Sequence, residues 1–410
     1  MESSPETGPR LDVAAVRSHF PALKGGAAHF DGPGGTQTPE PVGRAIAATL
    51  TGPLANRGTQ TAAQRNAEDA VAACRAAMAD LLGGEAAGMV FGRSSTQNTM
   101  DMARAIAKGW TAGDEVVVTR LDHDANITPW RIAAEARGAT VRFADFDPAT
   151  GELEPAQVER VLAEGRTKLV AVTGASNLIG TMPDLPAIAE LAHAAGAWLF
   201  VDGVHLAAHA FVDVAALGAD LFACSPYKFL GPHCGVLYGR PEVLERIAPD
   251  KLAVSTDAVP ERFELGTLPY ELMAGTTAAV DFLAALVPSG SGSRRERLRT
   301  SLTALERHEE RLRTRIEEGL ARLPGCTLHS RARRRTPTLL VTFAGHDAAD
   351  VAAFLAERGV NAPASHFYAL EASRRLGLGD AGGLRIGLAP YTDDSDVDRL
   401  LEGLTAYIDR

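Results

Sequence analysis

Short, uninterrupted apolar runs recur along the chain between residues 88 and 240. Seven such runs read GMVFG, DEVVVT, TVRFAD, KLVAVTG, AWLFVD, ADLFAC and CGVLYG. Continuous runs of this length are typical of strands that are buried on both faces of a sheet. Segments of helical length, such as LPAIAELAHAAG with its closing glycine, lie between most of them. The pattern predicts a doubly wound α/β fold, in which helices cover both faces of a mostly parallel, seven-stranded sheet.

The remainder of the chain predicts a smaller domain and its connections. The segment VPSGSGSRRER, residues 287–297, is typical of a linker, and a long amphipathic helix is expected over 297–322. The later runs TPTLLVTFAG and GLRIGLAPY predict strands of a small α/β domain. We therefore expect an N-terminal arm over 1–28 that packs on the small domain, a large domain over 29–286, and a linker helix with the small domain over 287–410.

Polar segments follow five of the predicted strands. They read RSSTQNT, RLDHDAN, ASNLIGT, GVHLAAH and SPYKFLGP. In open α/β sheets, ligands bind beyond the carboxyl ends of the strands. Because these ends meet at one edge of a parallel sheet, the five segments predict a single site.

Composition narrows the classes of partner. The chain has 410 residues and a net charge of −10, which argues against a nucleic-acid binder. The basic cluster RARRR, residues 331–335, is interpreted as a solvated loop rather than an anion site. No stretch is apolar enough to span a membrane, and the start MESSPETGPR lacks the apolar core of a signal peptide. The four cysteines show no metal spacing. We expect a cytoplasmic protein without membrane or nucleic-acid partners.

Two residues at predicted strand ends are candidates for chemistry. Lys228 is one of only five lysines, and it follows the run ADLFAC. A lysine at a buried strand end can act as an amine nucleophile, although a solvated surface lysine is the alternative. Asp202 ends AWLFVD, where a buried carboxylate is costly unless a cation pairs with it. Its alternative role is to cap a helix in DGVHLAAHA.

Together these residues suggest a pyridoxal 5′-phosphate site. That cofactor requires a lysine for a Schiff base and an acid beside its pyridine nitrogen. It also requires a phosphate site at the start of a helix, which SSTQNT at 94–99 supplies ahead of the helical MDMARAIA. His123, in LDHDAN, is a flat group that can lie on the ring face. No single element is specific, but the set in this order is.

With these motifs in hand, the chain resembles the class V aminotransferase family of fold-type I pyridoxal phosphate enzymes. Within it, the chain is most similar to the cysteine desulfurase and selenocysteine lyase branch. The resemblance runs from HFDGPGGTQTP to DVDRLLEGL and rests on VDGVH followed by SPYKFLGPHCGVLYG. It implies that Lys228 carries the cofactor, that Asp202 pairs with the pyridine nitrogen, and that His123 stacks on the ring.

The resemblance also implies further contacts with cofactor and substrate. Asn177 and His205 are expected near the ring hydroxyl and the substrate, and Arg385, in LRIGLAPY, is expected to bind the substrate carboxylate. Thr267, in FELGT, is expected to reach the phosphate in the other subunit of a homodimer. The phosphate is expected on Ser95, Thr96, Gln97, Ser225 and Tyr227.

The chain departs from the desulfurase pattern at one loop. Desulfurases of this branch carry a catalytic cysteine shortly before the carboxylate-binding arginine, but the matching loop NAPASHFYALEASRRLG has none. Tyr368 takes that place, with His366 before it. Cys326, in LPGCTLHS, belongs to a turn into a strand, and we interpret Cys224 and Cys234 as core thiols. A persulfide mechanism is therefore not expected.

Two histidines raise the question of a metal. His205 stands where the family often has glutamine, and its imidazole can still donate to the cofactor ring oxygen. His205 and His209 have the i, i+4 spacing of zinc ligands on a helix, but no third ligand is evident, so no metal is expected.

Without a sulfur acceptor, loss of the substrate α-proton leads to elimination, epimerisation or transamination. Lys228 is the expected proton carrier. Tyr368 or His366 would either assist a leaving group or line the pocket. We predict a C–S lyase that acts on a cysteine thioether or S-conjugate, with a role in secondary metabolism. The alternatives are an aminotransferase or a decarboxylating oxidative deaminase and, from another class, a non-catalytic binding protein with this fold.

Overall fold

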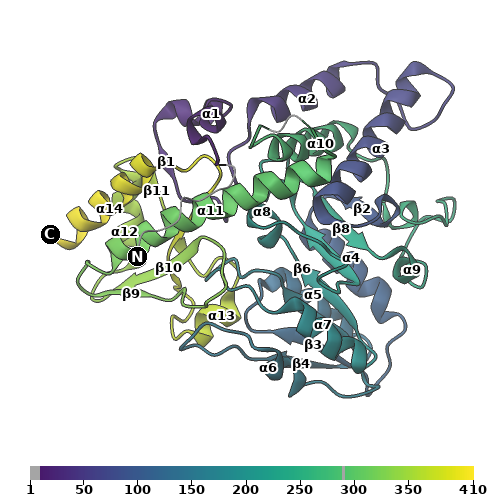
Figure 1. The fold of residues 1–410 in the computed structure, drawn as a ribbon. Helices are drawn as coiled ribbons and strands as arrows, with labels where there is room; N and C mark the ends of the chain where they lie inside the picture. The colour runs from purple at the N-terminus through teal and green to yellow at the C-terminus, as the bar shows by residue number, and fades with distance from the viewer. Residues whose placement is uncertain (1–9, 289–290) are drawn as a thin grey trace.

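The computed structural model describes residues 10–288 and 291–410 (Figure 1). Its large sheet has the strand order β2-β8-β7-β6-β5-β3-β4. Only β8 runs antiparallel to its neighbours. All seven predicted runs form these strands, so the predicted mostly parallel, seven-stranded sheet is confirmed. The strands are β2 (Met89–Gly92), β3 (Glu115–Thr119), β4 (Thr140–Ala144), β5 (Thr167–Thr173), β6 (Trp198–Asp202), β7 (Leu221–Cys224) and β8 (Gly235–Gly239).

Alternate side chains of each central strand enter two different cores. In β3, Val117 packs on one face of the sheet, whereas Val116 and Val118 pack on the other. The first core includes residues of α3, α7, α10 and α11, and the second includes residues of α4, α5 and α9. The edge strand β4 instead alternates between exposed and half-buried residues. Two-sided burial therefore explains why the inner strands are continuously apolar.

Helices lie between most of the strands of the large sheet, as the sequence predicts, and short 3₁₀ helices lie in several of the connections. The α-helices are α1 (Val13–Arg17), α2 (Glu40–Thr51), α3 (Ala62–Leu82), α4 (Ser95–Ala107), α5 (Thr128–Glu135), α6 (Pro155–Glu159), α7 (Leu185–Ala194), α8 (Leu206–His209), α9 (Pro241–Leu244), α10 (Tyr270–Ala284), α11 (Arg294–Leu320), α12 (Ala348–Ala356), α13 (Leu370–Arg375) and α14 (Asp394–Ile408). The 3₁₀ helices are η1 (Pro21–Gly25), η2 (Ala86–Gly88), η3 (Asp124–Asn126), η4 (Pro226–Lys228) and η5 (Glu261–Phe263).

A second, smaller sheet follows in sequence, with the order β12-β13-β10-β9. Both predicted C-terminal strands are present in it, as β10 and β13. A separate pair, β1 with β11, joins the start of the chain to this region. Together with α12, α13 and α14 these strands form the small domain. The strands are β1 (Ala28–His29), β9 (Cys326–Leu328), β10 (Thr338–Phe343), β11 (Val360–Asn361), β12 (Ala364–Ser365) and β13 (Gly383–Gly387).

The long helix α11 connects the two parts of the molecule (Figure 1). Leu298 and Leu302 pack in the core of the large domain, whereas Leu312 and Ile316 pack in the core of the small domain. The helix begins three residues before the predicted start, inside the predicted linker. Ser293 and Glu296 form a reciprocal capping box, which fixes the start of the helix at Arg294.

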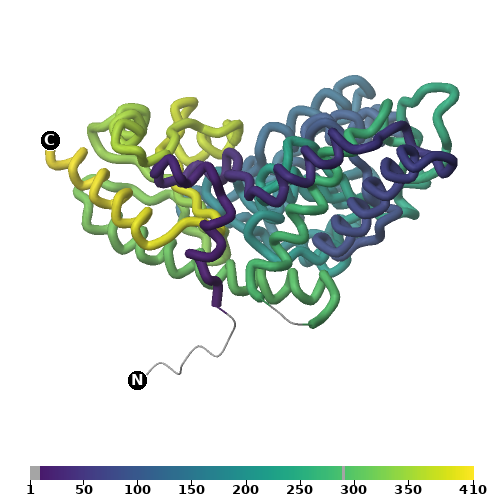
Figure 2. Tube along the Cα trace, turned by 90° about the horizontal axis from the view of Figure 1, so that it is seen from above, coloured from purple at the N-terminus to yellow at the C-terminus, as the bar shows by residue number. Residues whose placement is uncertain are grey.

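The N-terminal segment passes from one lobe to the other (Figure 2). The Arg17 guanidinium donates to the Asp396 carboxylate over 2.7 Å and to the Tyr391 carbonyl over 2.5 Å. Both partners lie late in the chain, next to and within α14. The expected arm over 1–28 falls partly outside the described residues, which begin at residue 10.

Two of the four arginines in the basic cluster at 331–335 pair with carboxylates. Arg333 pairs with Glu152 and Glu154, and Arg335 pairs with Glu317 over 2.6 Å. Arg333 itself remains 85% exposed. In the part of the chain that the structure describes, no helix is both long and apolar enough to cross a bilayer.

Gly203, directly after β6, allows a close approach of two strands. A Cβ at this position would lie 1.8 Å from the Phe222 ring on β7. We predict that Gly203→Ala lowers the melting temperature through overpacking of about 1–3 kcal/mol. Gly43→Ala is the matched control, because a Cβ there meets nothing within 4 Å in the interior of α2, and it should leave stability unchanged or raise it. Equal melting temperatures for both variants would contradict this account.

Candidate active site

A cavity of about 560 Å³ lies at the carboxyl ends of the parallel strands, between the large sheet and the small domain. Residues from all five polar segments that follow the predicted strands line it. The small domain supplies the opposite wall. The lining includes the predicted site residues Ser95, Thr96, His123, Asn177, Asp202, His205, Tyr227, Lys228, Tyr368 and Arg385.

The half-buried Lys228 amine faces this cavity and contacts no carboxylate among the described residues. It lies in η4, directly after β7, and its Nζ donates to the backbone carbonyls of Pro33 and Gly34. Burial and, to a smaller extent, the charge of Arg385 lower the pKa of Lys228 to about 7, while Asp202 acts in the opposite direction. A large fraction of the amine is therefore neutral near pH 7.

The Asp202 carboxylate lies at the end of β6 and faces the same cavity. Its Oδ1 accepts from the Val204 amide over 3.0 Å. No cation contacts it among the residues that the structure describes. Burial raises the pKa of Asp202 to about 6, although the Val204 amide and Lys228 oppose this shift. The carboxylate is thus a desolvated acceptor without a cationic partner among the described residues, which fits a protonated ring nitrogen.

His123 borders the cavity from the loop after β3. Its Nδ1 accepts from the Ala125 amide over 3.0 Å. Burial, aided by Lys228, lowers the pKa of His123 to about 4, so the ring is a neutral, flat surface. A network that the sequence prediction missed holds this loop: Asn126 donates to Asp122 over 2.7 Å, and Trp130 donates to Asn126 over 3.0 Å. The i, i+4 spacing of these polar residues was the available signal.

The start of α4 presents unused hydrogen-bond donors to the cavity. Ser94 caps the helix by accepting from the Gln97 amide over 3.1 Å. The helix therefore begins at Ser95, earlier than the predicted MDMARAIA segment. No acceptor contacts the amides of Ser95 and Thr96 within the described ranges, and the Ser225 hydroxyl lies 3.1 Å from that of Ser95. Such a helix start is a site for an anion.

Four predicted site residues do not line the cavity: Gln97, Ser225, Thr267 and His366. The Gln97 side-chain amide donates to Asp101 over 3.0 Å and thus lies along α4. His366 accepts from the Tyr368 amide over 3.1 Å through its Nδ1. Thr267 is exposed and lies outside the cavity.

Arg385, on β13, is almost completely buried, with 2% of its surface exposed. It donates to the Asn177 carbonyl over 3.0 Å, and the Phe367 ring lies 3.5 Å from its guanidinium carbon. Its Nε has no partner among the described residues. Burial lowers the pKa of Arg385 to about 9, with the Asp31 carboxylate opposing the shift. It remains a cation near neutral pH, and of its nitrogens only Nη1 donates to a described residue.

The loop before β13 adopts strained backbone geometry at the cavity mouth. Phe367 and Tyr368 have φ values of 51° and 59°, which L-residues rarely adopt. Two bonds hold them: Asn177 donates to the Phe367 carbonyl over 2.9 Å, and the Asp124 amide donates to the Tyr368 carbonyl over 2.7 Å. The Tyr368 ring stacks on His123 with centroids 5.5 Å apart.

No cysteine lines the cavity among the described residues. Cys224 and Cys234 are buried, and burial raises the pKa of both thiols. Cys326 lies on β9 of the small sheet, where burial raises the pKa of its thiol to about 11. None of the described histidine, cysteine and carboxylate residues forms a group that could hold a metal ion.

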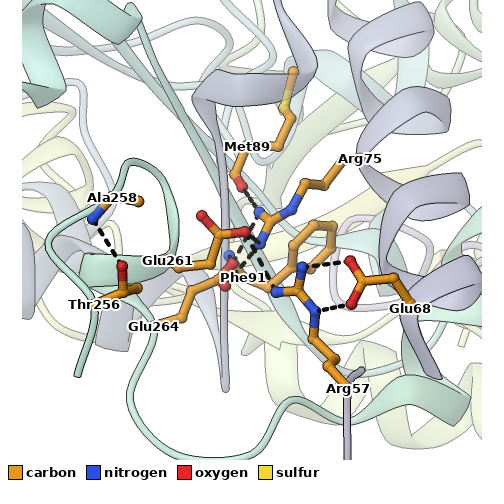
Figure 3. A network of polar contacts seen from close by, with 9 residues as sticks. All are labelled: Arg57, Glu68, Arg75, Met89, Phe91, Thr256, Ala258, Glu261 and Glu264. Atoms are coloured by element: carbon orange, nitrogen blue, oxygen red, sulfur yellow. Dashed lines mark hydrogen bonds and ion pairs between the residues drawn. The ribbon is translucent and has the colours of Figure 1, made fainter. Parts of the chain in front are cut away.

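A buried ion pair holds the segment that carries Thr267 (Figure 3). The Arg75 guanidinium donates to both oxygens of Glu264, over 3.0 and 2.8 Å. Glu264 also accepts from the Phe91 amide over 2.9 Å, which ties the segment to β2. The side chains of the pair are only 8% and 3% exposed, so the interaction is shielded from solvent. Glu264, three residues before Thr267, is thus anchored to the large sheet.

Comparison with known proteins agrees with the fold. The family model described as Aminotransferase class-V matches residues 28–400. An uncharacterized protein of Mycobacterium tuberculosis, MT3887, is 34% identical over 96% of this chain and 99% of its own. A cysteine desulfurase of Dickeya dadantii is 33% identical over 85% of this chain and 84% of its own. The crystal structure of the Escherichia coli cysteine desulfurase CsdA superposes with a TM-score of 0.86, at 28% identity, over 97% of this chain and 98% of its own.

These matches define the class of protein first: a fold-type I, pyridoxal phosphate-dependent enzyme. More specifically, the chain belongs to the class-V aminotransferase family and is similar to its cysteine desulfurases. The family resemblance inferred from the sequence motifs is confirmed.

The lowered pKa of Lys228 predicts how the cofactor aldehyde reacts with the protein. Only the neutral amine adds to an aldehyde, so the loading rate should rise with pH through about pH 7 and level off above about pH 8. Stopped-flow absorbance of ligand-free protein mixed with pyridoxal phosphate measures this rate, and Lys228→Ala provides the background. A rate that still rises steeply above about pH 9 would show an ordinary lysine.

The raised pKa of Asp202 predicts a pH-dependent cost to folding. The folded protein holds this proton more tightly than the unfolded chain does, so the carboxylate destabilises the fold as pH rises from 3.8 through about 6. Asp202→Asn should stabilise the ligand-free protein at pH 8 by about 1–2 kcal/mol, allowing for screening by solvent in the cavity, and have little effect at pH 4. Melting temperatures at both pH values test this. The exposed Asp69→Asn is the control, and an equal gain from both variants would refute the assignment.

Proposed function

We propose that the protein is a C–S lyase that cleaves the Cβ–S bond of an S-substituted cysteine. With one water, the substrate yields a thiol, pyruvate and ammonia. One observation carries the proposal: no cysteine of the described residues lines the cavity, and Tyr368 stands on the loop where a sulfur acceptor is expected. Sulfur removed from the substrate has no thiolate to receive it and therefore departs as the thiol.

The cavity residues fit pyridoxal phosphate. The free amides of Ser95 and Thr96, with the Ser225 and Tyr227 side chains, would hold the phosphate. The unpaired Asp202 carboxylate would accept from the protonated pyridine nitrogen, and the neutral His123 ring would cover one face of the cofactor. When bound through Lys228, the cofactor withdraws electrons from the substrate α-carbon.

Chain residues supply substrate binding and proton transfer. The buried Arg385 guanidinium, with Nε free, would bind the substrate carboxylate and so fix the α-carbon near Lys228. A lysine whose pKa is about 7 is suited to accept the α-proton as a neutral amine and return it as an ammonium. Tyr368, which lines the cavity mouth, would border the departing sulfur group. His366 lies outside the lining, so we assign it no chemical role.

The proposal includes a cytoplasmic homodimer in which Thr267 reaches the partner's phosphate. Thr267 is exposed on a segment that also exposes the large apolar side chains Leu252, Val254 and Leu265. Exposed apolar side chains gathered on one segment are typical of a contact surface. The buried Arg75–Glu264 pair would hold that segment in place. The four cysteines form no disulfide, which suits a reducing compartment.

The reaction is tested with cofactor-loaded protein and S-methyl-, S-benzyl- and unsubstituted cysteine. Thiol from the S-substituted cysteines is measured with a chromogenic disulfide, sulfide from cysteine by a sulfide-specific dye reaction, pyruvate by coupled reduction, and alanine by chromatography. We expect thiol and pyruvate in equal amounts and no alanine, and we expect Lys228→Ala to abolish both products. Alanine with transferable sulfur, or turnover that requires a 2-oxo acid, would contradict the proposal.

Two substitutions at Tyr368 separate packing from proton donation. If the ring lines the pocket, Tyr368→Phe keeps kcat within about threefold, because the stack on His123 survives. Tyr368→Ala should raise KM by about three- to tenfold, because a ring stack of this kind contributes about 0.5–1.5 kcal/mol. A large loss of kcat in Tyr368→Phe would instead assign the hydroxyl a role in protonating the leaving group.

A further inference from the structure

His205 connects the cavity to the small domain through one ring nitrogen. It precedes α8, is 3% exposed, and lines the cavity. Its Nε2 lies 3.0 Å from the Thr336 hydroxyl and 2.9 Å from the Thr338 hydroxyl. Thr338 begins β10, and Thr336 lies two residues before it. A side chain of the large domain is thus held at one end by two hydroxyls from the small domain.

The hydroxyl protons determine which ring nitrogen is protonated. Thr338 is completely buried, and among the described residues its hydroxyl contacts only His205 Nε2. A buried hydroxyl without an acceptor is costly, so Thr338 donates to Nε2. Thr336 differs, because its hydroxyl can donate to the Gly180 carbonyl, 3.4 Å away. Since Nε2 accepts, the proton of the neutral ring lies on Nδ1.

The surroundings of His205 oppose a second proton. Burial lowers the pKa of the ring well below its ordinary value, and His209, Lys228 and Arg385 add to this effect. The His209 ring meets His205 edge-on, with centroids 4.8 Å apart. His209 in turn contacts the buried Glu309 carboxylate over 3.0 Å. Burial and the charges of Lys228 and Arg385 keep His205 neutral, so its tautomer decides what it presents to the cavity.

We propose that Thr338 is a positioning residue that fixes His205 as the Nδ1–H tautomer. His205 then presents an N–H donor to the cavity rather than a lone pair. The tautomer of His205 does not depend on the proposed function. Only the group that accepts from its Nδ1–H does, because that group would be the ring oxygen of the cofactor. The small domain, through β10, therefore sets the hydrogen-bonding character of a side chain on the large domain.

The first experiment reads the tautomer directly in ligand-free protein labelled with ¹⁵N-histidine. Two-bond ¹H–¹⁵N spectra distinguish the tautomers, and His205→Asn identifies the resonances. We expect Nδ1–H in the wild type and a change towards Nε2–H in Thr338→Val, where the Thr336 hydroxyl donates to the Gly180 carbonyl and accepts from Nε2. Thr338→Ser, which keeps the hydroxyl, and the matched control Thr336→Val should both retain the wild-type tautomer. Nε2–H in the wild type, or a wild-type spectrum in Thr338→Val, would overturn the proposal.

The second experiment asks whether the donor acts on the cofactor. In loaded protein, the pH midpoint of the cofactor absorption change should rise by about half a unit or more in Thr338→Val, because the ring oxygen loses a donor that stabilises its negative charge. Thr338→Ser and Thr336→Val should match the wild type. An unchanged midpoint in Thr338→Val would overturn the role at the cofactor. Failure to bind the cofactor would refute the proposed function, whereas the first experiment decides the tautomer independently.

Discussion

The structure depends on two groups of opposite charge, Lys228 and Asp202, that face one cavity and do not contact each other. Burial moves the pKa of Lys228 down to about 7 and that of Asp202 up to about 6. Direct pairing would stabilise both charges and remove their reactivity. Instead the amine is held by the carbonyls of Pro33 and Gly34, and the carboxylate by one backbone amide. The free-energy cost of desolvating both groups is offset by the apolar strands β6 and β7, at the ends of which they lie.

The small domain completes the site from the other side of the cavity. Arg385 provides a buried cation, and the Phe367 ring packs over its guanidinium. Thr338 forms a hydrogen bond with the ring of His205. Helix α11 packs in both cores, so the two walls of the cavity are mechanically linked. The strained loop that carries Tyr368 is fastened to the large domain by two hydrogen bonds.

The sheet and the central residues of the site could be predicted from sequence, because the signals are local. Two-sided burial produces apolar runs, and a parallel sheet brings the polar residues after them together, as with Lys228 and Asp202. The predicted start of α11 at residue 297 is three residues too late, because the capping box of Ser293 and Glu296 starts the helix at Arg294. Likewise, the cap at Ser94 places the start of α4 earlier than predicted. The Gln97 side chain, which is expected at the phosphate, instead donates to Asp101.

Other features depend on contacts that are distant in sequence, so no local pattern indicates them. The pairing of His205 with Thr338 spans both domains, and the left-handed backbone of Phe367 and Tyr368 is imposed by bonds from Asn177 and Asp124. The ion pair of Arg75 with Glu264 joins segments that are far apart along the chain.

The central claim is that sulfur leaves this site as a free thiol without passing through the protein. Intact-protein mass spectrometry of the loaded enzyme, sampled during turnover of cysteine and of an S-substituted cysteine, tests it most directly. The account predicts that no sulfur atom is added to the chain at any time, while thiol or sulfide accumulates in solution. A protein species that carries an extra sulfur atom during turnover, and loses it to an added thiol, would contradict the account.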